Sequence, residues 1–356
     1  MTPIEQRYRR VLRMLPKSYR EVWEDDMVAT FLASVETDDR EDAEYVADYG
    51  RPGWPEVLSI AALAIRLRIG SAGAPARYAA WSRAIRFCVL AVLLVHATAG
   101  VIAAAMSLWL AGLLPLPVAA PQVPEPPGYP ESWRQAYLFS ALVGLLWVPA
   151  FFGLIRGRAG RWMVPAAAVA TVAASTAIVS ITGQPFTAEF CFTNLITVLL
   201  PLGLAAFHRG APPVSRRAWL VAFGMSTAVM AGYALLFIRP EPPLPPLDWA
   251  GLWCLVVVIA IIVHLARRAL GRPTDPAWTA ALTILAVTAL GMRLATLFDY
   301  FRFAATGWHP ATVPLAIAEA VVVAAAAAWI AFVSARTLSR LPATTADAAA
   351  WSTTIR

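Results

Sequence analysis

The chain has 356 residues, of which 59% are hydrophobic and 14% are charged, and its mean hydropathy is +0.62. Ordinary soluble domains are about half apolar and about a quarter charged, so this composition excludes a typical soluble enzyme or binding module and indicates a membrane protein. The formal net charge of +7 does not indicate binding to nucleic acid, because the arginines lie in short groups at the ends of apolar segments.

Long apolar segments with almost no charge follow one another from about residue 87 onward. Each is about 20 residues long, which is the length a helix needs to cross about 30 Å of hydrocarbon. In lipid every backbone N–H and C=O must be bonded within its own segment, so such segments must be helical. The sequence therefore predicts an all-α, polytopic membrane helix bundle with about eight transmembrane helices and a small N-terminal cytoplasmic helical head. The predicted spans are residues 87–113, 136–155, 162–182, 190–207, 218–238, 249–266, 278–298 and 313–335.

The distribution of arginine predicts how the spans are oriented. Alternate connections and the C-terminal tail are rich in arginine, whereas the remaining connections hold only Arg134, Arg239 and Arg302, each accompanied by an acid. Arginine-rich connections stay on the cytoplasmic side of bacterial membranes. We therefore expect a multi-pass protein of the bacterial inner membrane with both termini in the cytoplasm. The first apolar segment starts only after about 85 residues, which argues against a cleaved signal peptide.

An internal repeat predicts how the spans are grouped. The sequence Pro-Glu-Pro-Pro at 124–127 recurs at 240–243, and at the same offset Trp133 corresponds to Trp249 and Trp162 to Trp278. We interpret this as a duplication of two parallel four-span halves, residues 86–208 and 215–336. The proline-rich connections at 115–130 and 240–246 are expected to be stiff outer loops, serving either as spacers or as a recognition site. Residues 337–356 are expected to form a disordered cytoplasmic tail.

Residues 1–80 have a different composition and form the predicted head. Thirteen of the 22 acids lie between Glu5 and Glu56, so this segment faces water. Apolar residues at helical spacing predict a first helix that ends at Pro16, and Ser18 with Glu21 forms a capping box for a second helix. Further helices are expected at about 38–50 and from Pro55 onward. The helices either pack on each other, bind a protein partner, or lie on the bilayer. The apolar stripe of the second helix is predicted to contain Tyr19, Trp23, Met27 and Phe31.

Two segments of the head carry a resemblance to known proteins. They are RYRRVLRMLPKSYREVWEDDMVATFL and, after a short gap, DDREDAEYVADYGRPGWPEVLSIAALAIRLRIG. Together they resemble the cytoplasmic N-terminal segment of a set of actinobacterial multi-pass membrane proteins. They are also similar to the helical prefix ahead of some bacterial permeases and of membrane proteins encoded beside PadR-type regulators. The resemblance covers about the first 85 residues and implies a regulatory or assembly module without catalytic residues.

Ionisable residues inside the spans are the first candidates for a functional site. Arg293 in the seventh span and Glu319 in the eighth are expected at similar depth, so they are predicted to pair. Two interpretations remain open: a gate or polar binding element, or a structural ion pair in which Arg293 also reaches outward toward Asp299. The corresponding positions of the first half are Ala177 and Gly203, so the pair belongs to one half only.

His96 in the first span and Asn194 in the fourth are weaker candidates. His96 is expected to bond across helices, with a proton relay as the alternative. His264 is expected at the membrane interface, and the three cysteines are expected to be small buried side chains. The sequence contains no GxxxxGK[ST], GxGxxG or HExxH motif. We therefore predict no catalytic, cofactor-binding or metal site, and no binding of nucleic acid.

The most favoured function is that of a non-enzymatic regulatory, scaffold or transport-associated protein in the lipid bilayer, whose head binds a cytoplasmic protein partner. The alternative is a permease-like transporter that moves a small or lipophilic solute.

Overall fold

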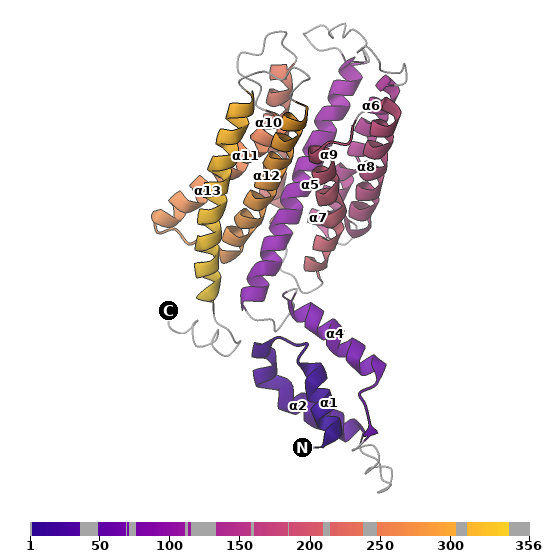
Figure 1. Ribbon diagram of the computed structural model, residues 1–356, viewed down its shortest axis with the longest axis vertical. Helices are drawn as coiled ribbons and strands as arrows, with labels where there is room; N and C mark the ends of the chain where they lie inside the picture. The colour runs from indigo at the N-terminus through magenta and orange to yellow at the C-terminus, as the bar shows by residue number, and fades with distance from the viewer. Residues whose placement is uncertain are drawn as a thin grey trace. The chain divides into compact units, whose positions relative to one another are not determined.

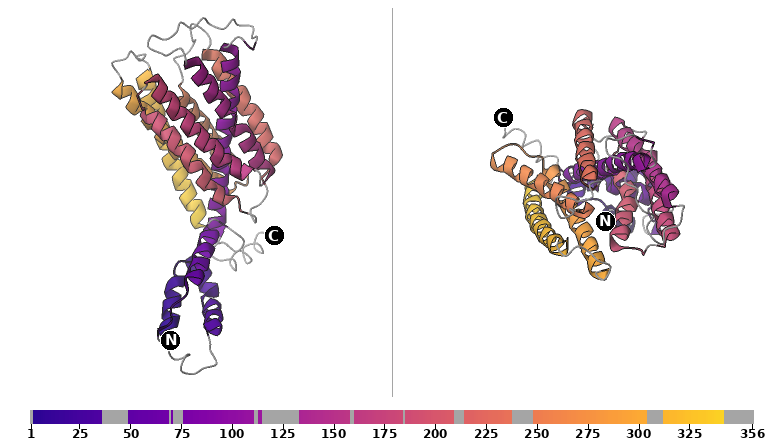
Figure 2. Two further views of the ribbon diagram at one scale, coloured as in Figure 1. Left: turned by 90° about the vertical axis from the view of Figure 1, so that its right-hand side faces the viewer. Right: turned by 90° about the horizontal axis from the view of Figure 1, so that it is seen from above.

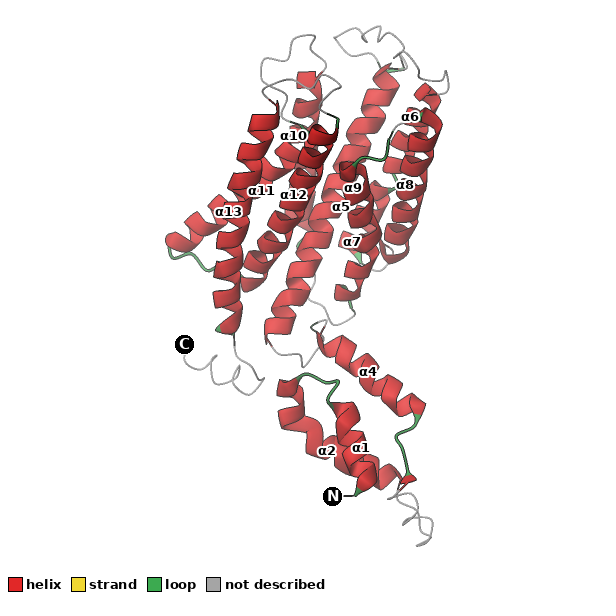
Figure 3. Ribbon diagram, in the orientation of Figure 1, coloured by secondary structure: helices red, strands yellow, loops and turns green. Residues whose placement is uncertain are grey.

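All regular structure in the described part of the chain is helical, as predicted (Figure 3). The chain divides into two compact units. One contains Met1–Ala84 with His208–Ala211 and Ser334–Arg356, and the other contains Ile85–Phe207 and Pro212–Val333. The computed structural model describes residues 2–35, 49–68, 70, 76–110, 113–114, 133–157, 160–183, 185–208, 214–237, 248–303 and 312–341. The predicted proline-rich loops, the third head helix except its last residues, and the tail beyond 341 lie outside these residues.

The head contains three described helices, α1 (Pro3–Leu12), α2 (Lys17–Val35) and α4 (Trp54–Arg68). They share one apolar core, in which the rings of Tyr8 and Phe31 stack with their centroids 4.0 Å apart. The packing of the helices on each other is therefore the arrangement found for the head. The buried core residues are Ile4, Tyr8, Leu12, Leu15, Val28, Phe31, Ile60, Ala64 and Leu67.

Polar contacts at the edge of this core join the same three helices. The Arg9 guanidinium on α1 lies 3.4 Å from Glu24 and 2.9 Å from Asp25, both on α2. The hydroxyl of Tyr8 donates to Glu56 of α4 over 3.1 Å. Burial, together with this bond and the charge of Glu56, raises the pKa of Tyr8 to about 12.

The predicted N-cap of the second head helix is wrong. Helix α2 begins at Lys17, and the carbonyl of Pro16 accepts the first amide bonds, so Ser18 lies within the first turn and is not the N-cap. Trp23 is 48% exposed, because α1 packs on the side of α2 that carries Val28 and Phe31.

The second unit contains the helices that are long and apolar enough to cross a membrane. Eight such spans occur among the described residues, which confirms the predicted number. They are formed by α5 (Ala76–Leu110), α6 (Trp133–Gly144) with α7 (Trp147–Arg156), α8 (Gly160–Thr182), α9 (Ala188–Leu199) with the 3-10 helix η1 (Leu200–Ala206), α10 (Arg216–Phe237), α11 (Trp249–Ala269), α12 (Pro276–Arg302) and α13 (Thr312–Ser339).

Two spans of the first half are interrupted, whereas the sequence predicts continuous helices. Between α6 and α7 the amide of Val148 bonds to Leu145 three residues earlier, so the regular α-helical pattern is lost at Leu145 and Leu146. Pro149 explains the position of this break, because its ring has no N–H and excludes the carbonyl of Leu145 four residues before it. In the fourth span, Pro201 lies at the start of η1 in the same way.

Within this unit, helix α5 lies between α6–α8 on one side and α11–α13 on the other, and α9 is bonded directly to α12 (Figures 1 and 2). Its Phe87 stacks on Trp278 of α12, with ring centroids 4.5 Å apart. Its Val89 faces Gly203 of η1, where an added Cβ would lie 2.3 Å from the valine side chain. Helices α6 and α11 start 116 residues apart, as do α8 and α12, which is the offset of the predicted duplication. The duplication itself stays a prediction.

The cysteines only partly follow the prediction. Cys88 and Cys254 are buried, but Cys191 is exposed on the surface of α9, where the apolar thiol requires no protein partner.

Candidate functional site

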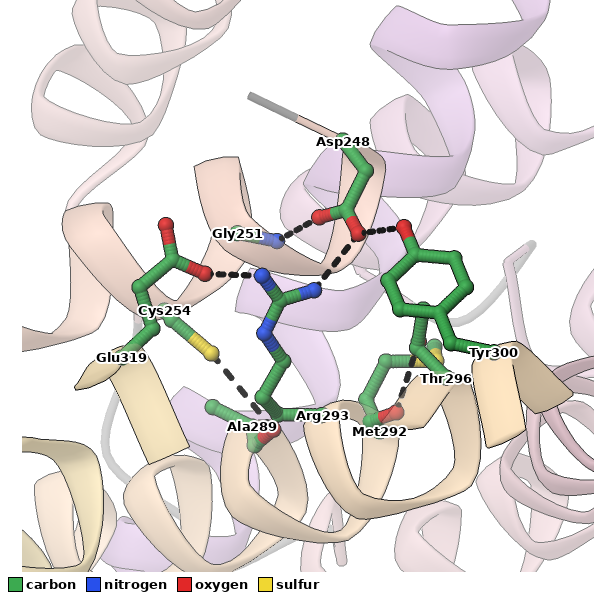
Figure 4. A network of polar contacts seen from close by, with 9 residues as sticks. All are labelled: Asp248, Gly251, Cys254, Ala289, Met292, Arg293, Thr296, Tyr300 and Glu319. Carbon is green, nitrogen blue, oxygen red and sulfur yellow. Dashed lines mark hydrogen bonds and ion pairs between the residues drawn. The ribbon is translucent and has the colours of Figure 1, made fainter. Parts of the chain in front are cut away.

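The predicted pair of Arg293 and Glu319 forms, and it belongs to a larger polar cluster (Figure 4). Arg293 lies on α12 and is only 2% exposed. Its Nη1 donates to Oδ2 of Asp248 over 2.6 Å, and its Nη2 donates to Oε2 of Glu319 on α13. One buried guanidinium therefore joins three helices, α11, α12 and α13.

Asp248 is the most highly bonded member of this cluster. It is the N-cap of α11, and its Oδ1 accepts from the amide of Gly251 over 2.6 Å. Its Oδ2 accepts from Arg293 and also from the hydroxyl of Tyr300 on α12. A carboxylate at a helix N-terminus is further stabilised by the helix dipole. Asp248 thus ties the start of α11 to the end of α12.

Gly251 provides the space in which the two acids approach each other. A Cβ at this position would lie 2.9 Å from Oε2 of Glu319 and 3.0 Å from Oδ1 of Asp248. These oxygens lie close to one point of α11, where any larger residue would displace them. A glycine is required here for close approach and not for its backbone angles.

The cluster contains two carboxyl groups and one guanidinium, so the acids are in excess. Asp248 receives three described hydrogen bonds, whereas Glu319 receives one, from Arg293. The Nε of Arg293 is buried and has no hydrogen-bond partner within the described residues. Removing one member of such a buried pair leaves the other charge uncompensated, which costs far more than the pair contributes as a whole. The arrangement is that of a clamp between helices.

Asp299 does not contact Arg293, contrary to one predicted interpretation. Its two carboxylate oxygens instead accept from the amides of Ala188 and Glu189, each over 2.8 Å, at the start of α9. Free amides at a helix N-terminus are strong donors to a carboxylate. Asp299 therefore fastens α12 to α9, and Arg293 is left to the pair on α11 and α13.

The weaker candidates His96 and Asn194 lie in the first half, apart from this cluster. The imidazole of His96 stacks on Trp147 with ring centroids 4.6 Å apart, and the indole Nε1 of Trp147 donates to Thr171 over 2.9 Å. The side-chain amide oxygen of Asn194 accepts from Ser175 of α8 over 3.0 Å, a bond across helices. His264 similarly bonds across helices, with its Nε2 3.0 Å from the hydroxyl of Thr279.

A cavity of about 260 Å³ lies beside the break between α6 and α7. Its lining combines polar side chains, among them His96, Thr171 and Ser175, with Gly100 and Gly144. Irregular backbone at membrane depth is tolerated only where protein or a cavity surrounds it. The lining does not include Arg293 or Glu319, so the cavity and the charged cluster are separate sites.

Metal ligands do not gather in the described residues, where no group of three or more His, Cys, Asp or Glu side chains converges. The polar side chains that do converge are engaged with other helices. The polar side chains described above form interhelical bonds, and some of them line the cavity at His96.

Two members of the charged cluster, Asp248 and Tyr300, are absent from the sequence-based candidates. Tyr300 follows Arg293 by seven residues and thus lies on the same face of α12, which is a signal that periodicity contains. Asp248 has a weaker signal, since an acid directly before an apolar helix is usually only an N-cap.

The eight apolar helices define the chain as an integral multi-pass membrane protein. No protein-family model, curated protein or solved structure matches it. Its function has to be argued from its own residues.

Proposed function

We propose that this chain is a non-enzymatic membrane protein whose head binds a cytoplasmic protein partner and whose eight-span body anchors the head and supports sensing or transport. The proposal places it in the bacterial inner membrane with both termini in the cytoplasm, as the arginine distribution predicts. The regulatory or assembly role implied by the head's resemblance to permease prefixes forms part of the proposal.

One observation carries this proposal, the exposed surface of α2. The head completes its core with other residues, yet Val22 and Trp23 on α2 remain 50% and 48% exposed. Exposed acids, Asp25 and Asp26, lie on the same helix. Tryptophan is enriched among the residues that dominate binding at protein interfaces. The surface fits a partner that offers an apolar pocket surrounded by basic side chains.

The clamp at Arg293 supports an anchoring role for the second half of the body. Both terminal nitrogens of its guanidinium are engaged with carboxylates of neighbouring helices, and the side chain is buried. A group that must bind and release a solute would need free donors facing an aqueous path.

The test uses the full-length protein with a photo-crosslinking amino acid at position 23, illuminated in cells, followed by purification and identification of the crosslinked protein. Binding of the purified partner to the protein in nanodiscs is then measured for wild type and for Trp23→Asp. We expect Trp23→Asp to lose binding while its thermal midpoint stays unchanged. Met14→Asp is the control, because Met14 is 39% exposed, lies outside α2, and should retain binding. Equal binding by all three proteins would contradict the proposal.

The cavity at His96 favours a second candidate, a permease-like transporter for a small solute. Ligand sites of transporters often lie at mid-depth beside a broken helix. The test is the reaction of Ala174→Cys, which lines the cavity, with a membrane-impermeant thiol reagent. If adding a solute slows the reaction of the thiol reagent with Ala174→Cys, transport would be supported. Val169→Cys is the control and should not react, because its side chain is 71% exposed within the same membrane span and faces lipid, which excludes the reagent. No reaction at Ala174→Cys would exclude a water-filled path.

A further inference from the structure

Helix α4 of the head is apolar on two opposite sides. One side is buried against α1 and α2 through Ile60, Ala64 and Leu67. On the other side Trp54 is 80%, Leu58 63% and Ile65 56% exposed, and Ala62 lies between them and is also exposed. Positions 54, 58, 62 and 65 follow one another at helical spacing, so they form a single stripe along the helix. We call these four residues the α4 stripe.

Helices α4 and α2 of the head differ in the sign of the charges that they carry. The one acid of α4 is Glu56, which accepts from Tyr8 of α1. The sequence of its last turn contributes Arg66 and Arg68, and the first turns of α5 add Arg77 and Arg83. On α2, by contrast, Glu21, Asp25 and Asp26 are exposed. An anionic surface would therefore attract α4 and repel α2.

The connection to α5 keeps α4 close to the bilayer. Helix α4 ends at Arg68, and α5, which forms the first membrane span, begins at Ala76. The seven intervening residues reach at most roughly 25–30 Å when fully extended. The predicted apolar segment of α5 begins only at Phe87, about 16 Å further along the helix. Wherever the head sits, the end of α4 therefore stays within roughly 45 Å of that point, a distance that allows it to reach the lipid headgroups.

We propose that α4 is an interfacial helix that lies on the bilayer surface where α5 enters, with the α4 stripe inserted at the boundary of headgroups and acyl chains. A tryptophan and aliphatic side chains on one face, with arginines nearby and no exposed acid, is the pattern of helices that lie in this plane. Tryptophan itself is enriched at membrane interfaces. The basic residues select anionic lipid. This inference does not depend on the proposed partner, although it leaves α2 turned away from anionic lipid.

The experiment compares two exposed alanines in the full-length protein. Cys88, Cys191 and Cys254 are replaced, and Ala62→Cys on α4 or Ala29→Cys on α2 receives an environment-sensitive fluorophore. Each protein is placed in nanodiscs containing anionic lipid, and quenching is measured with doxyl-labelled lipid and with aqueous iodide. We expect strong lipid quenching and little iodide quenching at position 62, and the reverse at position 29. Leu58→Cys repeats the measurement at a second position of the α4 stripe in case Ala62→Cys does not fold.

Two further measurements tie the result to the α4 stripe. Adding Leu58→Glu and Ile65→Glu should abolish lipid quenching at position 62 and restore iodide quenching, with the head core unchanged because neither residue is buried. Replacing the anionic lipid by neutral lipid should weaken the lipid quenching. Iodide quenching at position 62 of the unaltered stripe would overturn the proposal by showing that it faces water. Quenching by neither reagent would also overturn it, because the stripe would then be covered by protein, either the body or a second copy.

Discussion

The two halves of the body hold their helices together by different means. In the first half, the described side-chain hydrogen bonds among α6–α9 themselves are neutral: Trp147 bonds to Thr171, and Ser175 bonds to Asn194. In the second half, a buried arginine joins three helices through two carboxylates. The first half has interrupted helices and a polar cavity, whereas α11, α12 and α13 are continuous.

This difference follows from how helices associate in lipid. Burial of apolar surface gives little driving force there, so close packing and polar bonds decide which helices associate. A broken helix needs neighbours that surround its irregular backbone, and Gly100 of α5 meets Gly144 at the end of α6, where a Cβ would lie 2.3 Å from the carbonyl oxygen. Continuous helices have no irregular backbone that neighbours must surround, and a few strong bonds hold them together. The predicted repeat therefore includes the positions at which helices start, but it does not include the charged cluster, because the position of the first half that corresponds to Arg293 is Ala177.

The charged clamp should show the largest effect of any single substitution in either half. Arg293→Leu leaves two partly buried carboxylates without their cation, so we expect a loss of about 3 kcal/mol in the free energy of unfolding, the lower end of the range for a fully buried pair. Unfolding titrations in mixed micelles measure this loss. Arg302→Leu is the control, because Arg302 is exposed, and its described contacts are a 3.4 Å bond to the carbonyl of Phe186 and the ring of the adjacent Phe303. Adding Asp248→Asn and Glu319→Gln to Arg293→Leu should recover part of the stability, and no recovery would show that Arg293 acts through packing alone.

The glycine contact of the first half should rank second. Gly100→Ala places a methyl group against the backbone of Gly144, which cannot move aside as a side chain can. We expect a loss of about 1–3 kcal/mol, measured in the same titration. Gly224→Ala on α10 is the matched control, since nothing lies within 4 Å of its added Cβ, and it should be neutral or slightly stabilising. Similar effects at both positions would mean that the α5–α6 contact is not tight.

The sequence predicts features that depend on composition over a long segment. Apolar length alone places the eight spans, and the depth of single charges within spans seven and eight brings Arg293 to Glu319. These predictions succeed because lipid penalises any charge or unbonded backbone, whatever the tertiary contacts. The break at Leu145 has a local cause in Pro149, yet an apolar segment with one proline near its centre resembles a continuous span.

Features that depend on which surfaces meet are not encoded locally. Asp248 has the sequence of an ordinary helix cap, and only the packing of α12 on α11 gives it Arg293 and Tyr300 as partners. The burial of the aromatic side chains of α2 is likewise not encoded locally. Phe31 is buried and Trp23 is exposed, although both fit one predicted stripe. Tertiary contacts choose between faces that have equal apolar character.

Gly251→Ala tests the second half at the same kind of residue as Gly100→Ala. Its methyl group would meet only the ends of the Glu319 and Asp248 side chains, which can shift. We therefore expect a smaller loss, about 1 kcal/mol, than for Gly100→Ala. The same unfolding titration measures it, and its combination with Arg293→Leu should be non-additive, because both changes act on one cluster. Strict additivity would separate Gly251 from the clamp.

The neutral bond between Trp147 and Thr171 should have the smallest effect and thereby define the lower end of the comparison. Thr171→Val keeps the shape of the side chain but removes the acceptor of the 2.9 Å bond from the indole Nε1. Net contributions of neutral hydrogen bonds are about 0.5–1.5 kcal/mol, so the loss should lie in this range. Thr227→Val on α10, whose hydroxyl bonds within its own helix, is the control and should change stability less. Because Thr171 lines the cavity, water there could replace the lost acceptor, and a Thr171→Val variant as stable as wild type would show that the first half is hydrated at this depth. That outcome would sharpen the contrast between the halves, with a hydrated site in one and a charged clamp of directly bonded side chains in the other.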